Sequence, residues 1–375
     1  MEPVLEQAFQ LGIEKCLRDA KRLDGFPHTT TDGRWLTNRD GHWTGGFFVG
    51  MLWLAYLETG SPRGEELALN WTQRLGARCD DDSSHNLGFL FEPSHVRGFR
   101  ISGRSELREG ALHAARALAR RYRSRGRYIP AWSSELNPAY EGLAIVDTVM
   151  NLPLLFWAAE ESGEGSLGRI GRAVGATIAG QHLRPDGSSI HVIYHDPLTG
   201  RPLKAGTHQG VSADSCWSRG QAWTLHGFTR LAALTADPGL LEVAWRVADH
   251  YLMRLGSAAI PPWDFDRADP SEPKDTSAAA IAASGLLELA RVTAQQSYRL
   301  AAERMLRGLA TTCVDFEHPD APGLVLHATV DLPHGSGVDV STVYGDHYFL
   351  EALFKLRRPG DWHRLGCVAN YGAAD

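Results

Sequence analysis

The sequence predicts an all-α fold, an (α/α)6 barrel in which six helical hairpins form a toroid. Apolar residues recur at spacings of three and four along twelve segments, whereas strand-like alternation is convincing only over 188–194. The predicted helices differ in character: some, such as 105–123, are amphipathic, and others, such as 45–59, are apolar nearly all round. Since a helix that is apolar on every side is buried, this alternation predicts an inner ring of helices inside an outer ring.

The elements follow one another without a break in composition, so we expect a single domain over residues 1–375. The first helix is amphipathic and lacks the basic and apolar regions of a signal peptide, so we expect none. The short strand over 188–194 precedes a turn at 196–200. No sequence repeat accompanies the pattern, which disfavours a repeat array. The twelve helices are expected over 3–21, 45–59, 62–78, 86–97, 105–123, 144–160, 166–182, 217–235, 239–255, 276–292, 296–313 and 343–356.

The composition is that of an ordinary globular chain, with 43% hydrophobic and 22% charged residues among 375. A formal net charge of −6 argues against a nucleic-acid partner, and the Arg-rich segment 116–127 is expected to be a solvated face. No apolar run reaches the roughly 18 residues that a membrane span needs. Eleven tryptophans point weakly to carbohydrate, because an indole ring can pack on a sugar.

The cysteines are scattered, with no CxxC pair and no Cys/His cluster that would indicate zinc. We therefore expect no metal site, and reduced thiols in a cytoplasmic protein. The five are Cys16, Cys79, Cys216, Cys313 and Cys367.

Polar, aromatic and glycine residues are concentrated where the buried helices begin. If the six inner helices run the same way, their N-termini converge at one end of the barrel, which is the expected design of a site at its mouth. Free N–H groups and partial positive charges there would favour an anionic ligand. The six beginnings are 42–47, 85–89, 147–151, 217–223, 275–278 and 344–348.

Asp147 opens the otherwise apolar run 145–157, and a carboxylate in that setting is costly unless it is hydrogen-bonded, paired or used. It stands where an N-cap or first-turn residue would stand, so helix capping is one interpretation. The other is that Asp147 faces a pocket, since five other helix beginnings are expected beside it.

Several further residues are candidates for the pocket. Arg219 is either a partner for a substrate carboxylate or part of a structural ion pair. The glycine-flanked loop 206–210 suggests close approach to a ligand. Trp43 and Trp132 could equally belong to the core. The candidate set is Trp43, Trp132, His191, His208, Gln209, Trp217, Arg219, Gln221 and Trp223.

These motifs, taken together and in order, resemble the unsaturated glucuronyl hydrolases of glycoside hydrolase family 88. The resemblance covers nearly the whole chain. The matching pieces are HWTGGF (42–47), HNLGFLF (85–91), IVDTVMNLPLLFWA (145–158), SSIHVIYHDPLTG (188–200), GTHQG (206–210), WSRGQAW (217–223), WDF (263–265), DTSAAAIAASGLLELA (275–290) and YGDHYFLEAL (344–353).

The resemblance implies an (α/α)6 barrel and oligosaccharide substrates that carry a 4,5-unsaturated uronic acid at the non-reducing end, as left by polysaccharide lyases. A general acid protonates C4 of the vinyl ether, water adds at C5, and the hemiketal opens with loss of the glycosidic bond. Asp147 matches the family's general acid and base, and the candidate set above matches its substrate pocket. No metal or organic cofactor is implied.

One position departs from the family. Its second carboxylate belongs to H-D-(L/I/T)-G-F, and this chain has Asn86 there. An amide binds a hydroxyl but cannot ionise, and the loss of a neighbouring negative charge should leave Asp147 less protonated. We therefore expect binding with weak turnover. An engineered substitution, a natural variant with altered chemistry and a sugar-binding pseudoenzyme are the three explanations.

Other enzymes of the same barrel remain alternatives. An inverting glycosidase would pair Asp147 with Asp346 or Asp275, and a sugar epimerase would use His191, His208 or His347. The sugar beyond the cleaved bond is expected to contact three loops, 79–85, 124–141 and 327–341. The sequence sets no oligomeric state.

Overall fold

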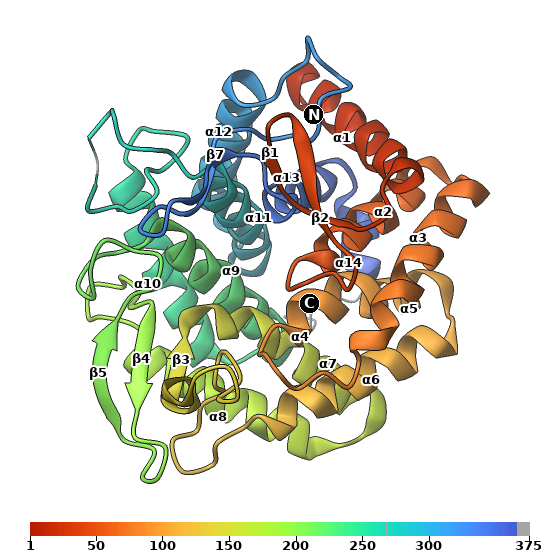
Figure 1. The fold of residues 1–375 in the computed structure, drawn as a ribbon. Helices are drawn as coiled ribbons and strands as arrows, with labels where there is room; N and C mark the ends of the chain where they lie inside the picture. The colour runs from red at the N-terminus through yellow and green to blue at the C-terminus, as the bar shows by residue number, and fades with distance from the viewer. Residues whose placement is uncertain (268, 366–375) are drawn as a thin grey trace.

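Six helical hairpins close into a ring in the computed structural model, which describes residues 1–267 and 269–365 (Figure 1). Each hairpin places an outer helix before an inner one, and each inner helix contacts the next, with α13 returning to α2. The outer helices are α1 (Pro3–Arg22), α3 (Pro62–Leu75), α6 (Ser105–Arg120), α8 (Gly165–Gln181), α10 (Pro238–Leu255) and α12 (Gln296–Thr312). The inner ones are α2 (Gly45–Thr59), α4 (Leu87–Phe91), α7 (Leu152–Ser162), α9 (Ser218–Thr235), α11 (Thr276–Thr293) and α13 (Val343–Arg357).

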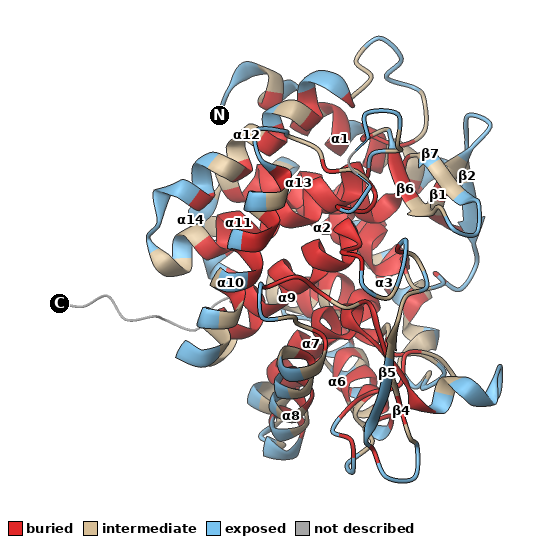
Figure 2. Cartoon of the chain, turned by 90° about the vertical axis from the view of Figure 1, so that its left-hand side faces the viewer, coloured by how far each residue is buried: buried red, intermediate tan, exposed pale blue. Residues whose placement is uncertain are grey.

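The (α/α)6 barrel predicted from the two kinds of helix is confirmed. The inner helices α2, α9, α11 and α13 are buried along most of their length, whereas the outer helices bury one face and expose the other (Figure 2). Two inner helices begin at a side-chain cap. Asp275 accepts from the backbone N–H groups of Ser277 and Ala278 at the start of α11, and Thr342 accepts from that of Gly345 at α13.

Two predicted helices are built differently from the expectation. The segment over 86–97 is not one regular helix: α4 is followed by a π-helical turn over Glu92–Val96 and then by α5 (Arg97–Ser102). Pro93 lies in the π-helical turn and has no backbone N–H to donate to the preceding turn, which interrupts the regular helix. The helix over 144–160 begins instead as strand β3 (Leu143–Ile145) and a 3-10 helix over Val146–Asn151, and α7 starts only after them.

Short strands occur where one was expected, in three small antiparallel sheets at one end of the barrel (Figure 2). The predicted strand over 188–194 starts later, at Val192, and pairs on both sides. Of the other strands, β3 is three apolar residues long and the rest carry polar residues, so they lack the sustained alternation by which strands are recognised. The sheets are β1 (Phe26–Thr31) with β2 (Arg34–Asn38), β3 with β4 (Val192–His195) and β5 (Pro202–Gly206), and β6 (Ala328–Asp331) with β7 (Ser336–Val340).

The inner helices approach one another at glycines. A Cβ on Gly88 of α4 would lie 2.3 Å from the Cα of Asn151, and one on Gly46 of α2 would lie 2.3 Å from the carbonyl oxygens of Phe89 and Leu90. A hydrogen bond joins the same two segments: the backbone N–H of Phe89 donates to Oδ1 of Asn151 at 2.8 Å. The beginnings of α2, α4 and α7 are thereby drawn together.

The opposite end of the barrel is closed by α14 (Pro359–Arg364). Trp362 is buried there, lies 4.7 Å from Nζ of Lys355 and donates from its indole N–H to Glu288 at 3.3 Å. Above it, buried Glu351 pairs with Arg97 at 2.6 Å and with Lys355 at 3.1 Å. This end of the barrel is therefore filled by aromatic and ion-paired side chains.

No helix within the described ranges is both long and apolar enough to cross a membrane. Among the described residues Cys16, Cys79, Cys216 and Cys313 are free thiols. Cys367, like the final segment of the expected single domain 1–375, lies outside the described residues.

We expect Gly88→Ala to destabilise the fold by about 1–3 kcal/mol, because the added Cβ meets backbone atoms that cannot move aside independently. Gly180→Ala in α8 is the matched control: its Cβ would meet nothing within 4 Å, so its free energy of unfolding should be unchanged or higher by up to about 1 kcal/mol. Urea unfolding of both variants measures this. Equal stability of the two would contradict the packing argument.

Candidate active site

Asp147 lies in the 3-10 helix that leads into α7, beside strand β4. The backbone N–H of Val146 donates to the carbonyl of His191 at 2.9 Å, which continues the β3–β4 pairing as far as this turn. Asp147 lies in the first turn of this 3-10 helix, one of the two positions expected for it. It is not a cap, because the N-cap positions of the two helical segments are Ile145 and Asn151. Oδ2 of Asp147 is buried and has no hydrogen-bond partner among the described residues, so its carboxyl group is free to act on a ligand.

Burial sets the protonation of Asp147. Desolvation raises the pKa of this carboxyl group from 3.8 to about 6, and the positive charge of Arg219 opposes that rise. Burial therefore raises the pKa of Asp147 without a carboxylate at position 86. The expectation that Asn86 leaves Asp147 less protonated than a carboxylate would stays a prediction. A carboxylic acid with a pKa near 6 can donate a proton at mildly acidic to neutral pH.

His191 faces Asp147, with Nε2 lying 3.8 Å from Oδ2 of the carboxyl group. Its other ring nitrogen, Nδ1, is the acceptor for the backbone N–H groups of His208 at 3.2 Å and Gln209 at 3.4 Å. Since Nδ1 accepts, the ring proton is on Nε2 and points toward Asp147. Burial, with the nearby charges of His208 and Arg219, holds the pKa of His191 well below its usual value, so the ring is a neutral donor.

Arg219 forms the structural ion pair, one of the two roles that the sequence left open. Its guanidinium is buried and pairs with Asp275 at 2.5 Å, and it donates to the carbonyl groups of Thr329 and Val330 on β6. These contacts use three of the five N–H donors of the guanidinium. The structural ion pair is thus present, and two donors and the positive charge remain for the site.

The two predicted glutamines are placed differently. The amide of Gln221 is fully used, donating to the carbonyls of Gly187 and Val247 and accepting from the backbone N–H of Ser189 at 2.7 Å. It therefore holds the segment that carries His191 and has no free donor for a sugar. Gln209 is partly exposed and donates to the carbonyl of Val330 at 2.8 Å.

The predicted tryptophans lie at different depths below the mouth of the barrel. Trp217 lies under His191 with ring centroids 4.5 Å apart. Trp43 is partly exposed and packs against Tyr344 at 5.1 Å. Trp223 is fully buried among Phe47 and other rings of the barrel interior, so it supports the pocket from below.

Asn86 is the N-cap residue of α4, but its side chain makes no capping hydrogen bond. It is partly exposed, and the contact of Gly88 and Phe89 with Asn151 ties its turn to that of Asp147. Oδ1 of Asn151 accepts from Phe89, while its Nδ2 donates to the carbonyl of Asp147 at 3.4 Å. The departure from the family thus lies on the turn next to the catalytic candidate.

His85 and Tyr344 are two residues whose importance the sequence reasoning did not recognise. His85 is buried, and its Nδ1 lies 2.8 Å from Oγ1 of Thr148, the residue after Asp147. The ring of Tyr344 lies 5.5 Å from the guanidinium of Arg219. Both belong to the beginnings of inner helices, so their place in that pattern was the available signal.

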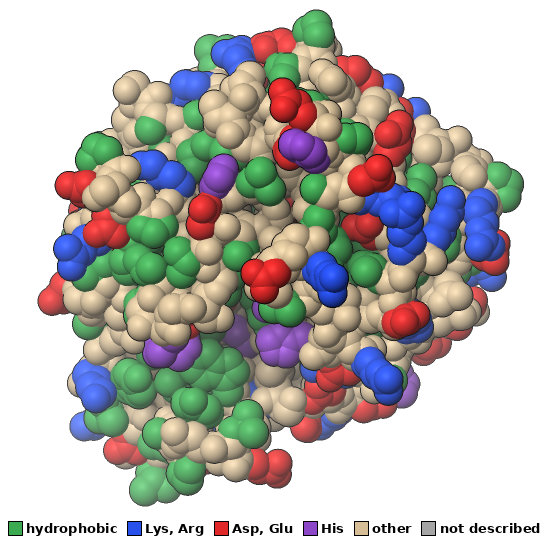
Figure 3. All heavy atoms as spheres, turned by 45° about the horizontal axis from the view of Figure 1, so that its top comes forward, with side chains coloured by type: hydrophobic (Ala, Val, Ile, Leu, Met, Phe, Trp, Pro, Cys, Tyr) green, Lys and Arg blue, Asp and Glu red, His purple; other side chains and the backbone are tan. Residues whose placement is uncertain are grey.

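The three loops expected to shape the next subsite meet at the mouth. Ser84 of 79–85 forms a bridge with Trp132 of 124–141, and the ring of Trp132 lies 5.5 Å from that of His208. His208 in turn stacks on His334 of 327–341 at 4.6 Å. Figure 3 shows a hollow near the centre of this face, with histidine side chains gathered around it.

Three of the side chains that the alternative enzymes would need are occupied, those of Asp275, Asp346 and His347. Asp275 is held by Arg219, and Asp346 accepts the backbone N–H groups of Leu324 and Val325 at 3.0 and 2.8 Å. His347 is buried between the carbonyl of Phe47 and Glu351. A second free carboxylate opposite Asp147 is not found among these candidates.

Comparison with known proteins identifies the family. No family model matches the chain. The chain is 35% identical, over 96% of its length, to the unsaturated glucuronyl hydrolase of Bacillus sp. (strain GL1), and it covers 99% of that protein. The chain belongs to the unsaturated glucuronyl hydrolases, glycoside hydrolase family 88. The predicted resemblance is confirmed.

Other unsaturated glucuronyl hydrolases agree in sequence and fold. The unsaturated chondroitin disaccharide hydrolase of Streptococcus pyogenes serotype M1 is 34% identical over 96% of this chain and 92% of its own. The crystal structure of the Bacillus sp. GL1 enzyme superposes with a TM-score of 0.90 at 33% identity, over 95% of this chain and 97% of that one. An unsaturated glucuronyl hydrolase specific for heparin superposes with a TM-score of 0.88 at 28% identity, over 96% and 99%.

Because the fold raises the pKa of Asp147 from 3.8 to about 6, it favours the protonated form, and ionisation weakens the fold. The stability that protonated Asp147 contributes to the folded state is fully present below about pH 4, and it is lost as the pH rises through about 6. A shift of this size corresponds to about 3 kcal/mol. We therefore expect Asp147→Asn to raise the free energy of unfolding at pH 8 by up to that amount, and by little at pH 4. Exposed Asp214→Asn is the control; urea unfolding across pH measures both, and parallel curves for wild type and Asp147→Asn would refute the argument.

Proposed function

We propose that this chain is a hydrolase that releases the 4,5-unsaturated uronic acid from the non-reducing end of lyase-generated, glycosaminoglycan-type oligosaccharides. One observation carries the proposal: Asp147 presents a buried oxygen without a hydrogen-bond partner among the described residues, on a group whose pKa burial raises to about 6. Membership of the unsaturated glucuronyl hydrolases supports it, and the relatives named above are enzymes for unsaturated glucuronyl and chondroitin disaccharide substrates.

In the proposed reaction Asp147 acts first as an acid. Its proton goes to C4 of the ring C4=C5 double bond, and the positive charge that develops at C5 is shared with the ring oxygen. The neutral carboxyl group is the required form, so burial supplies what this step needs. The carboxylate that remains lies near Arg219, whose positive charge stabilises it.

Asp147 then acts as a base. Water attacks C5 and gives a proton to the carboxylate, which restores the acid and leaves a hemiketal at C5. That hemiketal opens to a C5 ketone and a C1 hemiacetal, and the remainder of the oligosaccharide leaves from C1. His191, as a neutral Nε2–H donor 3.8 Å from Asp147, would orient the carboxylate or the attacking water.

The substrate pocket is proposed to be built by the residues around this pair. The flat unsaturated ring would stack on Trp43, which is partly exposed, and its carboxylate would face the free donors of Arg219. Trp217 is buried against His191 and Arg219 and would support them from below. His208, Gln209 and Trp132 would contact the next sugar, because they stand at the mouth. Gln221 and Trp223 are proposed to position these groups from behind.

We also propose that the protein is cytoplasmic. This proposal rests on the free, scattered thiols of the described residues.

Asn86 is proposed to lower turnover without abolishing binding. Because burial already raises the pKa of Asp147, the missing carboxylate at position 86 would act on the second stage of the reaction as well as on the first. A carboxylate there could accept a proton from water or stabilise positive charge at C5, and an amide can do neither.

We expect Asn86→Asp to raise kcat and to move the fall of activity at high pH upward, since an added negative charge near Asp147 raises its pKa further. The measurement is the loss of ultraviolet absorbance of an unsaturated chondroitin disaccharide across pH. Asn70→Asp on the exposed outer helix α3 makes the same chemical change away from the site and should have no effect. Equal turnover by wild type and Asn86→Asp would remove position 86 from the mechanism.

Asp147→Asn should abolish turnover in both backgrounds while binding of the same disaccharide persists. Saturated disaccharides and free N-acylhexosamines should not react, which separates this activity from that of an inverting glycosidase or an epimerase. Binding without turnover even in Asn86→Asp would identify a sugar-binding protein instead. A panel of unsaturated chondroitin, hyaluronan, heparin and gellan fragments then ranks the sugars accepted beyond the cleaved bond.

A further inference from the structure

Two groups of side chains in the described part of the chain could hold a metal ion. In each, one ligand atom from each of three residues lies within 4.8 Å of the other two. One group is His208, Asp331 and His334, and the other is Cys79, Asp80 and His113. They differ in chemistry and in position, and only the first stands at the mouth of the site.

We propose that His208, Asp331 and His334 bind a divalent transition-metal ion, with Zn²⁺ as the preferred ion. Two imidazoles and one carboxylate are ligands that zinc accepts, and a hard ion such as Mg²⁺ or Ca²⁺ prefers oxygen ligands alone. Three protein ligands leave the fourth position of a tetrahedral ion to water.

The distances between the ligand atoms are close to those around a bound zinc ion. Nε2 of His208 lies 3.6 Å from Oδ2 of Asp331, and Nδ1 of His334 lies 2.8 Å from Oδ1 of the same carboxylate. Ligand atoms around a tetrahedral zinc are about 3.3 Å apart, given bonds of about 2.0–2.1 Å. The imidazoles of His208 and His334 are 45% and 54% exposed, so they can rotate by the small amount that remains.

The chain holds the three ligands together before any ion binds. His208 comes from the 206–210 loop and the other two from the β6–β7 hairpin, and Gln209 already joins these segments by donating to the carbonyl of Val330 at 2.8 Å. The backbone N–H of His334 donates to Asp331 at 3.3 Å within the hairpin turn. Pre-ordered ligands reduce the entropy that binding must overcome.

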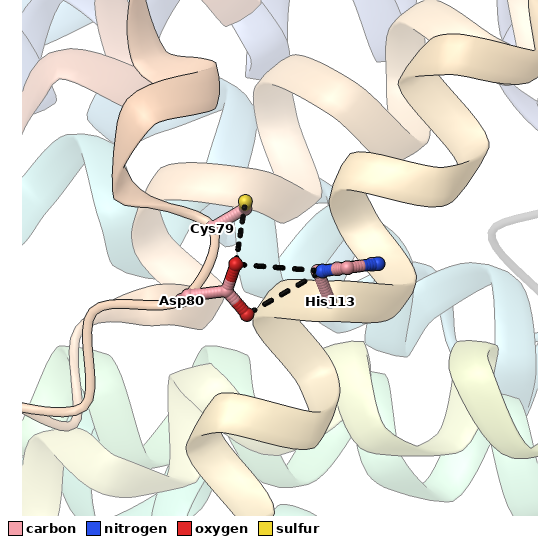
Figure 4. A group of neighbouring side chains, drawn as sticks. All are labelled: Cys79, Asp80 and His113. Atoms are coloured by element: carbon pink, nitrogen blue, oxygen red, sulfur yellow. Dashed lines mark hydrogen bonds and ion pairs between the residues drawn. The ribbon is translucent and has the colours of Figure 1, made fainter.

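The second group lacks these advantages (Figure 4). Asp80 lies between Cys79 and His113, with Nδ1 of His113 3.4 Å from Oδ1 of Asp80. Burial and the adjacent carboxylate raise the pKa of the Cys79 thiol, which disfavours the thiolate that a metal needs. The carboxylate of Asp80 is 66% exposed, against 12% for that of Asp331, and His113 belongs to the outer helix α6. This group serves as the control.

An ion at the mouth would couple to the site through His208. The backbone N–H of this residue donates to Nδ1 of His191, and its ring faces Trp132. Coordination would withdraw the ring from the substrate and fix the loop against the hairpin, so zinc would act as a reversible inhibitor. This consequence rests on the proposed function, whereas the binding itself does not.

The test is calorimetric titration of ZnCl₂ into the full chain after chelator treatment, without substrate. Wild type and His113→Gln should each bind one zinc ion, with equal affinity. His334→Gln should weaken that site by at least about 10–100-fold, the range typical for loss of a residue that only supports a ligand. Asp331→Asn should weaken it as well. MgCl₂ should not compete at equal concentration.

Zinc binding by His334→Gln with unchanged stoichiometry and affinity would overturn the proposal, as would loss of the site in His113→Gln or no binding by wild type. Because His334 lies in an exposed turn, thermal melting without metal should match wild type. Turnover of the unsaturated disaccharide should fall with zinc and recover with EDTA in wild type, and stay constant in His334→Gln. If no variant turns over that substrate, the proposed function fails while the titration still decides the metal site.

Discussion

The buried ion pair between Arg219 and Asp275 is the interaction on which the mouth of the barrel depends. Removing two charges from water costs several kcal/mol for each ion, so such a pair persists only when the remaining donors and acceptors are satisfied. Here the carbonyls of Thr329 and Val330 take further N–H groups of the guanidinium, and Ser277 donates to Asp275 at 2.5 Å. One pair thereby joins α9, α11 and β6.

The same guanidinium limits how strongly burial can act on Asp147. Apolar surroundings alone would raise the pKa further and favour the neutral acid, and a positive charge nearby favours the carboxylate. The two effects oppose each other and leave the pKa at about 6. A group that must be an acid in one step and a base in the next needs such a balance, because neither form can be too stable.

Hydrophobic pattern was sufficient to predict the ring of twelve helical segments and its closure, because burial on all sides distinguishes the inner helices from the outer ones. It did not show that the segments over 86–97 and 144–160 are interrupted. It could not find the other strands of the described chain, because none of them shows a sustained alternation between apolar and polar residues. Nor could the motif WSRGQAW reveal that Arg219 faces the site while Gln221 faces the backbone of Gly187, since side-chain direction depends on tertiary packing. The effect of position 86 on the pKa of Asp147 stays a prediction. The burial that raises this pKa to about 6 could not be predicted from the sequence, because the apolar shell around Asp147 comes from several helices.

The barrel has the form of a cup that is open at the mouth and closed at the far end. Trp362 of α14 and the ion pairs of Glu351 fill the closed end. A channel open at both ends would let a polymer slide through and be cut repeatedly along its length. A cup receives only the tip of a chain, and whatever is cleaved must leave by the route through which it entered. Each turnover therefore ends in complete release, and the architecture suits short fragments rather than processive digestion of long polymers.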